Sequence, residues 1–212
     1  MALVVFDFDG TLADTWRDIA TALNRTLAEA ELPLAEGTRV QAWIGHGVLP
    51  LLRRAARSED PARIEPLQAR FRVHYAACCL DTTALYPGVA AALAALAAHR
   101  LAVLSNKPAR FLEQIVAGLG LAARFQALVG GDALPVAKPD PATLAHVVAA
   151  CGAGDTVWMV GDSAVDVETG RRFGARTVGC AWGLRGAAEL RGAGADVVIA
   201  HPAELVPLIG SA

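Results

Sequence analysis

Two aspartates follow directly on an apolar run near the start of the chain, in the stretch VVFDFDGTLADT at residues 4–15. Carboxylates at the end of an apolar strand are costly to bury unless a cation meets them. Asp7 and Asp9 are two residues apart, so on a strand they point the same way, toward one ligand. The fold must therefore bring a positive charge to this point.

Apolar runs typical of strands recur along the chain and alternate with helical patterns. We predict strands at 3–8, 101–104, 126–129, 156–160, 176–180 and 196–199, and helices at 88–99, 109–118, 141–151 and 164–173. This alternation predicts the α/β class, with a doubly wound, mainly parallel sheet core that carries helices on both faces.

The stretch at residues 14–83 interrupts this alternation, because it contains no convincing strand. Its Ile19, Leu23 and Leu27 repeat every four residues, which indicates an amphipathic helix. Further helical patterns lie at 38–44, 47–57 and 61–80. We therefore predict an all-helical cap that is inserted directly after the first strand.

Domain boundaries follow from this arrangement. We predict an α/β core made of residues 1–13 and 84–212, and a helical cap domain at 14–83. The stretch TTALYPG at 82–88 is interpreted as the hinge that leads back into the core. Since 54% of the residues are hydrophobic, we expect a full core rather than disorder.

The residues that follow the predicted strands are the informative ones, because open parallel sheets bind ligands at the carboxyl ends of their strands. Acids, hydroxyls and both lysines of the chain come at these ends: Asp7, Asp9, Gly10, Thr11, Ser105, Asn106, Lys107, Lys138, Asp162 and Asp166. Three carboxylates with space for a phosphate beside them favour Mg²⁺, which binds a few carboxylates, waters and a substrate phosphate.

Two acids on one strand suit a hydrolase that works through a covalent intermediate. One carboxylate can attack as the nucleophile, and a second can protonate the leaving oxygen and later activate water. We assign the first role to Asp7, which lies deeper, and the second to Asp9, nearer the mouth. A lysine and the Ser105 hydroxyl would hold the equatorial phosphoryl oxygens.

The chain resembles the haloacid dehalogenase superfamily of phosphatases. Its four motifs appear in order, as DFDGT at 7–11, Ser105, Lys138 in KPDP, and GDSAVD at 161–166. The resemblance covers nearly the whole chain, since the helical insert falls where this family places its cap. Within the superfamily, the stretches SNKP, KPDP and IGHGVLPLLRRA look most like bacterial phosphoglycolate phosphatases.

The resemblance implies a role for each matching residue. Asp7 would be the phosphorylated nucleophile and Asp9 the general acid and base. Asp7, the backbone carbonyl of Asp9 and Asp162 would hold Mg²⁺, with Asp166 in support. The groups expected to bind the substrate are Gly10, Thr11, Ser105, Asn106 and Lys138. The implied substrate is a small phosphorylated metabolite, with 2-phosphoglycolate as the best guess.

Several residues keep a second interpretation. Asp162 and Ser163 precede a helical pattern, where N-capping is common. Asp166 could support the metal or only pair with Lys138. Lys107 could neutralise the pocket or be an ordinary surface lysine, and Asp132 is interpreted as a turn residue.

The cap residues that set specificity form a separate hypothesis. GHG at 45–47 precedes the helical stretch VLPLLRRAAR, and a helix N-terminus there would offer free N–H groups to a small anion. His46, and Arg53 with it, could add charge, so the cap would bind the carboxylate of a two-carbon leaving group. The alternative is that Gly45 and Gly47 are only turn residues.

Composition excludes several other classes. The net charge is −2 without runs of like charge, so we expect no nucleic-acid or membrane partner. The four cysteines form no C-x-x-C pair, which favours a reducing cytoplasm, and the start of the chain does not resemble a signal peptide. We expect a monomer or homodimer. Alternatives that stay open are a sugar-phosphate or amino-sugar-phosphate phosphatase, a phosphomutase, and a non-enzymatic phospho-accepting switch.

Lysine usage generates a first testable prediction. Of the 19 basic residues, only Lys107 and Lys138 are lysine and 17 are arginine. A lysine in such a chain can mark a place where a compact point charge fits and a planar guanidinium does not. We expect Lys138→Arg to fold but to lose most of its phosphatase activity. Near-wild-type turnover of this variant would mean that the bias toward arginine carries no information about the site.

Overall fold

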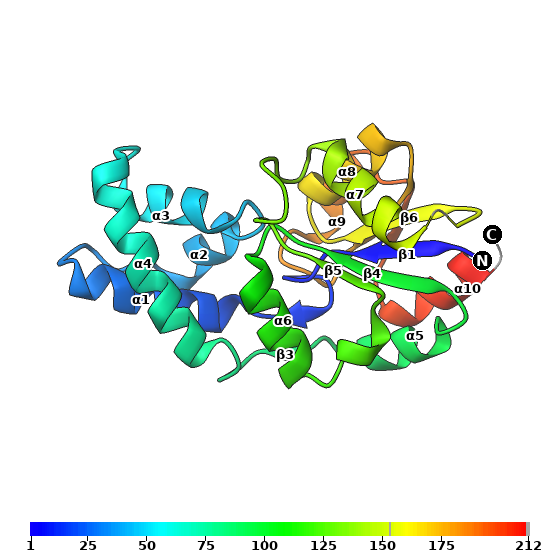
Figure 1. Ribbon diagram of the computed structural model, residues 1–212, viewed down its shortest axis with the longest axis horizontal. Coiled ribbons are helices and arrows are strands. Elements are labelled where there is room, and N and C mark those ends of the chain that lie inside the picture. The colour runs from blue at the N-terminus through cyan, green and yellow to red at the C-terminus, as the bar shows by residue number, and fades with distance from the viewer. Residues whose placement is uncertain (153, 211–212) are drawn as a thin grey trace.

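The computed structural model describes residues 1–152 and 154–210, and its centre is one parallel sheet (Figure 1). The strand order is β5-β4-β1-β6-β7-β8, and each neighbouring pair is parallel. The strands are β1 (Leu3–Phe6), β4 (Arg100–Leu104), β5 (Ala127–Val129), β6 (Val157–Gly161), β7 (Arg176–Cys180) and β8 (Val197–Ile199). Since β1 lies between β4 and β6, the residues after these three strands meet at one edge.

Helices cover both faces of this sheet, which confirms the predicted α/β fold class (Figure 1). Leu3 and Val5 of β1 pack in one cluster with Leu144 of α7, whereas Val4 and Phe6 pack in the other with Phe111 of α6. The core helices are α5 (Val89–Ala95), α6 (Ala109–Gly118), α7 (Pro141–Cys151), α8 (Ala164–Phe173), α9 (Gly186–Gly192) and α10 (Leu205–Gly210), with short 3₁₀ turns at Ala122–Arg124 and Pro202–Glu204.

Four helices form a separate layer beyond the carboxyl edge of the sheet, on the left in Figure 1. They are α1 (Trp16–Glu29), α2 (Gly37–Trp43), α3 (Val48–Ala56) and α4 (Pro61–Cys78). The predicted stripe of Ile19, Leu23 and Leu27 is fully buried on α1. Pro61 starts α4 because it lacks an N–H, and the Asp60 carboxylate accepts the hydrogen bond of the next free N–H, that of Ala62.

The prediction missed a pair of two-residue strands where the cap joins the core. β2 (Ala13–Asp14) and β3 (Ala84–Leu85) are antiparallel partners, and both are too short to show alternation. The division into residues 14–83 and the remainder stays a prediction, and its boundaries fall at this pair. Among the described residues, none of the helices has the length and apolar character needed to cross a membrane.

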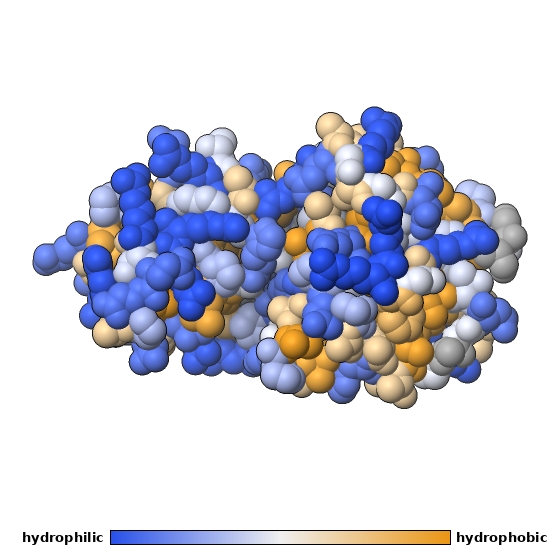
Figure 2. Space-filling model, turned by 90° about the horizontal axis from the view of Figure 1, so that it is seen from above, coloured by the Kyte–Doolittle hydropathy of each residue, from blue (hydrophilic) through white to orange (hydrophobic). Residues whose placement is uncertain are grey.

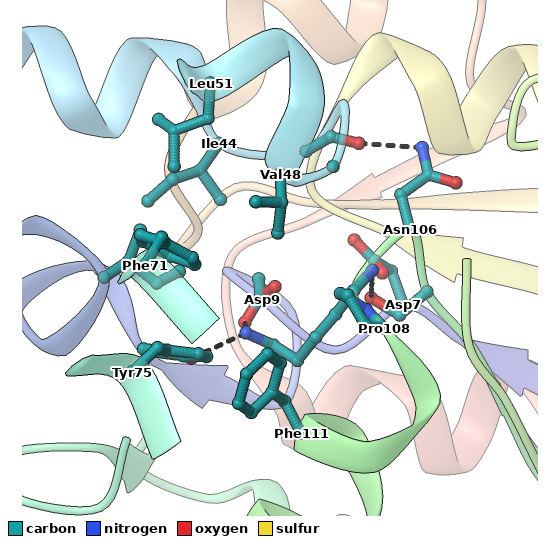
Figure 3. A pocket seen from close by; sticks show the side chains of 15 residues that line it. Asp7, Asp9, Ile44, Val48, Leu51, Phe71, Tyr75, Asn106, Pro108 and Phe111 are labelled. Carbon is teal, nitrogen blue, oxygen red and sulfur yellow. Dashed lines mark hydrogen bonds and ion pairs between the residues drawn. The ribbon is translucent and has the colours of Figure 1, made fainter. Parts of the chain in front are cut away.

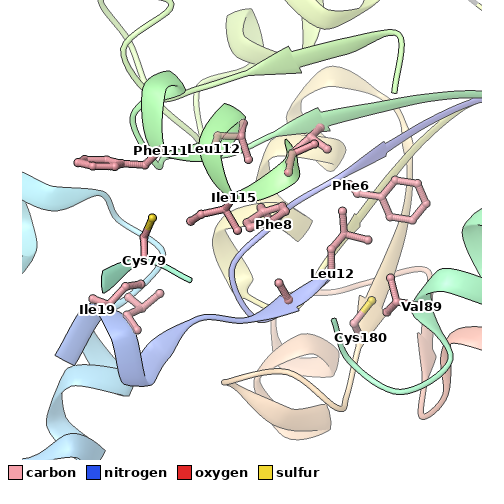
Figure 4. Packing of buried hydrophobic residues seen from close by; sticks show 14 of the residues in the cluster. Phe6, Phe8, Leu12, Ile19, Cys79, Val89, Phe111, Leu112, Ile115 and Cys180 are labelled. Atoms are coloured by element: carbon pink, nitrogen blue, oxygen red, sulfur yellow. The ribbon is translucent and has the colours of Figure 1, made fainter. Parts of the chain in front are cut away.

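A single hydrophobic cluster runs from the sheet into the cap. It joins Phe6 and Phe8 of the core to Ile19 of α1 and Tyr75 of α4, with Phe111 of α6 between the layers. Figure 4 shows Cys79 and Ile19 facing the end of α6 that carries Phe111. On the face seen in Figure 2 the surface over the cap helices is mostly hydrophilic, and large apolar cap residues such as Leu23, Leu52 and Phe71 are buried.

Asp18 links the first helix of the cap to the segment that leads from the cap back into the core. This residue of α1 is 1% exposed, and its carboxylate accepts hydrogen bonds from the backbone N–H and hydroxyl groups of both Thr82 and Thr83, at 2.6–3.1 Å. A buried carboxylate is stable only with such partners. The contact fixes the end of the cap beside its beginning.

We therefore expect Asp18→Asn to lower the free energy of unfolding by at least about 2 kcal/mol, because an amide turns its own N–H groups toward buried donors. The measurement is urea unfolding. The control is Asp81→Asn, since Asp81 is exposed and close in sequence to the same segment. Equal midpoints for the two variants would contradict this account of Asp18.

Candidate active site

Lys138 lies between two buried carboxylates at the carboxyl edge of the sheet. Its Nζ is 2.8 Å from Asp7 Oδ1 and 2.6 Å from Asp166 Oδ1, and the lysine side chain is 1% exposed. Burial alone would lower the pKa of Lys138, but the two carboxylates outweigh it and raise that pKa. Lys138 is therefore charged, and it supplies part of the positive charge that the buried aspartates require.

Asp162 is the third acid of this group and is held by the loops around it. Its Oδ2 accepts a hydrogen bond from the Leu184 N–H at 2.7 Å, and its Oδ1 accepts one from the Thr11 hydroxyl at 3.3 Å. Gly10 has a φ of +86°, and a Cβ there would lie 2.3 Å from Asp162 Oδ2. Only glycine permits both this backbone conformation and this close approach.

The three acids form a group that could bind a metal ion. Ligand oxygens of Asp7, Asp162 and Asp166 lie within 4.8 Å of one another, and all three residues are buried. Burial, followed by the charge of Asp166, raises the pKa of Asp7 to about 7 even though Lys138 opposes the shift. Burial, followed by the charges of Asp166 and Asp7, raises the pKa of Asp162. One lysine is thus too little countercharge for three carboxylates, and a hard divalent cation fits this donor set.

Asp9 faces a second lysine. Its Oδ1 is 3.1 Å from Lys107 Nζ and accepts a hydrogen bond from the Thr15 hydroxyl at 2.6 Å. Lys107 Nζ also donates to the Tyr75 hydroxyl at 2.7 Å and lies 4.6 Å from the centroid of that ring. The two acids of the first motif therefore have separate environments, with Lys138 on Asp7 and Lys107 on Asp9.

A small pocket opens between these acids and the cap (Figure 3). Its polar lining consists of Asp7, Asp9, Tyr75, Ser105, Asn106 and Lys107, and its apolar lining includes Ile19, Ile44, Val48, Leu51, Phe71 and Phe111. In Figure 3, Ile44, Val48 and Leu51 face the acids from the cap side. The free volume is ≈ 40 Å³, which suits only about three waters at roughly 10–15 Å³ each.

Two side chains of the core hold the cap loop at residues 44–47. The Asn106 amide donates to Gly45 O at 2.9 Å, and it also exchanges hydrogen bonds with the backbone of Lys138 at 3.0 and 3.2 Å. The Arg185 guanidinium donates to Ile44 O at 2.6 Å. The Asn106 side chain is thus occupied with positioning these loops, and its binding of substrate stays a prediction.

The predicted site residues are largely brought together. The first motif lies just after β1, which ends at Phe6 rather than at residue 8. Asp7 and Asp9 still face the same pocket, while the intervening Phe8 packs in the core. Ser105 lines the pocket, whereas the Thr11 hydroxyl is directed to Asp162. The catalytic, metal and substrate roles remain predictions.

His46 lies outside the pocket lining, although its neighbours Gly45 and Gly47 belong to it. Burial and the charges of Arg54 and Arg185 lower the pKa of His46, which favours the neutral ring. Arg53 forms an ion pair with Glu59. A charge from either side chain on a leaving group remains an untested prediction.

The structure decides between the two interpretations for some of these residues. Ser163, not Asp162, is the N-cap of α8, and Asp166 completes its capping box while pairing with Lys138. Lys107 is buried, so the surface interpretation is wrong. Asp132 accepts a hydrogen bond from Ala109 N–H, at the start of α6.

Sequence reasoning missed three groups around this site, namely Thr15, Tyr75 and Arg185. Tyr75 belongs to the buried face of α4, and nothing in its spacing distinguishes it from a packing residue. The rarity of lysine singles out Lys107 and Lys138 but gives no signal for these three groups.

Comparison with known proteins gives the family. Residues 1–174 match the family model of haloacid dehalogenase-like hydrolases. The chain belongs to this family. It is 43% identical to a phosphoglycolate phosphatase of Cereibacter sphaeroides, with 82% of each chain covered. It is 34% identical to one of Pectobacterium atrosepticum, which covers 98% of this chain and 92% of the relative.

Solved structures agree with this membership. A structure from Haemophilus somnus, described as a predicted phosphoglycolate phosphatase, superposes with a TM-score of 0.92 at 28% identity and covers 99% of this chain and 98% of its own. The haloacid dehalogenase-like resemblance is therefore confirmed, as is the enzyme class of a phosphoric monoester hydrolase.

The acidic cluster leads to a prediction that needs no turnover assay. We expect Mg²⁺ to raise the melting temperature, since binding at 100-fold Kd stabilises a folded chain by about 2.7 kcal/mol. Asp162→Asn should remove most of this shift. Glu168→Gln, an exposed acid on α8, is the control and should keep it. A full Mg²⁺ shift in Asp162→Asn would place the ion elsewhere.

Proposed function

We propose that this hydrolase is a Mg²⁺-dependent phosphomonoesterase that forms an aspartyl-phosphate on Asp7, with 2-phosphoglycolate as its substrate. The observation that carries the proposal is the separation of the two acids of the first motif. Both acids line the pocket, but Asp7 is paired with Lys138 in the acidic cluster and Asp9 with Lys107.

The chemistry follows from these positions. An Asp7 oxygen would attack phosphorus while Lys138 and the Ser105 hydroxyl stabilise the charge on the phosphoryl oxygens. Asp9 would give its proton to the leaving oxygen and then take one from the water that releases phosphate. Asp7, Asp162 and the backbone carbonyl of Asp9 would hold Mg²⁺, which supplies positive charge to the phosphoryl group.

The substrate assignment has two supports. Relatives at 34–43% identity are named phosphoglycolate phosphatases. The pocket beside Asp9 also contains a cation, Lys107, with which a carboxylate on the leaving group can pair. The cytoplasmic location also stays a proposal, supported by four cysteines that are free thiols. The oligomeric state, monomer or homodimer, and the lack of nucleic-acid and membrane partners also remain predictions.

Phosphate release from a panel of monoesters tests the proposal. We expect phosphate to be released fastest from 2-phosphoglycolate and more slowly from sugar and amino-sugar phosphates. No isomerised product should form. A phospho-accepting switch would release little phosphate, and a phosphomutase would isomerise a sugar phosphate. Either of these results would replace the proposed function.

Asp7→Asn is the variant that tests the nucleophile. The amide keeps shape and hydrogen bonding but cannot attack, so we expect activity to fall by at least ~10³-fold. Asp60→Asn is the control, because Asp60 is exposed and asparagine caps a helix equally well. A mild loss in folded Asp7→Asn protein would rule out covalent catalysis by this residue.

A further inference from the structure

We infer that Lys107 is the residue that selects a carboxylate-bearing leaving group, by binding that carboxylate in the pocket beneath the cap. This inference rests on the proposed function and assigns its substrate specificity to a core residue rather than to the cap histidine. It starts from the charge distribution in the pocket.

The cap side of the pocket has almost no side chains that could bind an anion. Its side chains there are Ile19, Ile44, Val48, Leu51 and Phe71, with Tyr75 as the polar exception. Among the described residues that line the pocket, Lys107 is the one cation. A carboxylate that enters this apolar space must be paired to be stable there. The charge therefore has to come from the core side.

The geometry of Lys107 suits this task. The side chain is buried, and its Nζ contacts Asp9 Oδ1 at 3.1 Å and the Tyr75 hydroxyl at 2.7 Å. An ammonium group has three donors, so a third remains beside these two contacts. The Tyr75 ring at 4.6 Å holds the cation in place. Figure 3 shows Tyr75 and Phe111 near Asp9, on the side away from Ile44, Val48 and Leu51.

Tyr75 can contribute a second donor. Burial, followed by the charge of Asp9, raises the pKa of the Tyr75 hydroxyl, so the group keeps its proton. In the contact with Lys107 the hydroxyl oxygen accepts, which leaves its O–H for a ligand oxygen. An N–H of Lys107 and the O–H of Tyr75 would thus face the same carboxylate.

Position relative to Asp9 determines which leaving group fits. In the proposed reaction Asp9 contacts the ester oxygen that joins phosphorus to the leaving group. The carboxyl group of 2-phosphoglycolate is bonded to the carbon that carries this oxygen. A cation that contacts Asp9 is therefore within reach of that carboxylate.

The other cations near the cap have different partners. Arg54 donates to Trp43 O at 3.4 Å, and Arg185 donates to Ile44 O. Arg53 pairs with Glu59, and His46 lies outside the lining with a lowered pKa. Each of these is less suited to the carboxylate than Lys107.

The test is a selectivity ratio, kcat/KM for 2-phosphoglycolate divided by kcat/KM for 2-hydroxyethyl phosphate, in which CH₂OH replaces the carboxylate. Both esters use Asp7 and Asp9 alike, so the ratio isolates recognition of the carboxylate. We expect a wild-type ratio well above one, and a decrease of about ten- to hundred-fold in Lys107→Met. His46→Ala is the comparison variant and is expected to keep most of the ratio.

The outcomes separate this inference from the proposed function. A preference that survives in Lys107→Met overturns the inference and leaves the function standing, and so does a preference lost only in His46→Ala. A wild-type ratio near one overturns the inference together with the 2-phosphoglycolate assignment, but not the phosphatase chemistry. No phosphate release from either ester overturns the proposed function.

Because Lys107 also pairs with Asp9, its variant could be too slow to assay. Calorimetric binding of both esters then replaces turnover, with Asp7→Asn compared with the double variant Asp7→Asn/Lys107→Met. Loss of the preference for 2-phosphoglycolate in the double variant supports the inference, and an unchanged preference overturns it.

Discussion

The ion pair of Lys138 with Asp7 and Asp166 is the contact on which the rest of the site depends. It joins the end of β1 and the first turn of α8 to the loop that follows β5, so three separate segments converge on one ammonium group. A buried ion pair of this kind is costly to desolvate, and removing one partner leaves an uncompensated charge. The Ser163 hydroxyl donates a hydrogen bond to Asp166 at 2.6 Å, and a bound divalent cation would neutralise the excess negative charge of the acids.

The same crowding explains why small residues surround the acids. A Cβ at Gly183 would lie 2.3 Å from the Cβ of Asp162, and a Cβ at Gly10 would lie 2.3 Å from its carboxylate. The cap adds its own constraint, because Asn106 and Arg185 fix the loop at residues 44–47 through backbone carbonyls rather than side chains. These two contacts do not involve the cap side chains that face the acids.

Much of this architecture could be predicted from the sequence, because its signals are local. Helices α6, α7 and α8 match the predicted 109–118, 141–151 and 164–173, and the acids and lysines at the strand ends meet as expected. The pair β2 and β3 could not be predicted, since two residues show no period. Contacts such as Lys107 with Tyr75 depend on how the cap packs on the core, and periodicity within α4 carries no information on that. For the same reason the sequence pointed to His46, which flanks a helix start but does not line the pocket.

The central claim is that Asp7 accepts the phosphoryl group while the acidic cluster holds Mg²⁺ beside it. A crystal structure with Mg²⁺ and beryllium trifluoride, which mimics a phosphoryl group on a carboxylate, tests it most directly. The account predicts beryllium bonded to an Asp7 oxygen, fluorines contacting Lys138 and Ser105, and the ion on Asp7 and Asp162. Beryllium on Asp9 or Asp162, or an ion bound away from this cluster, would contradict it.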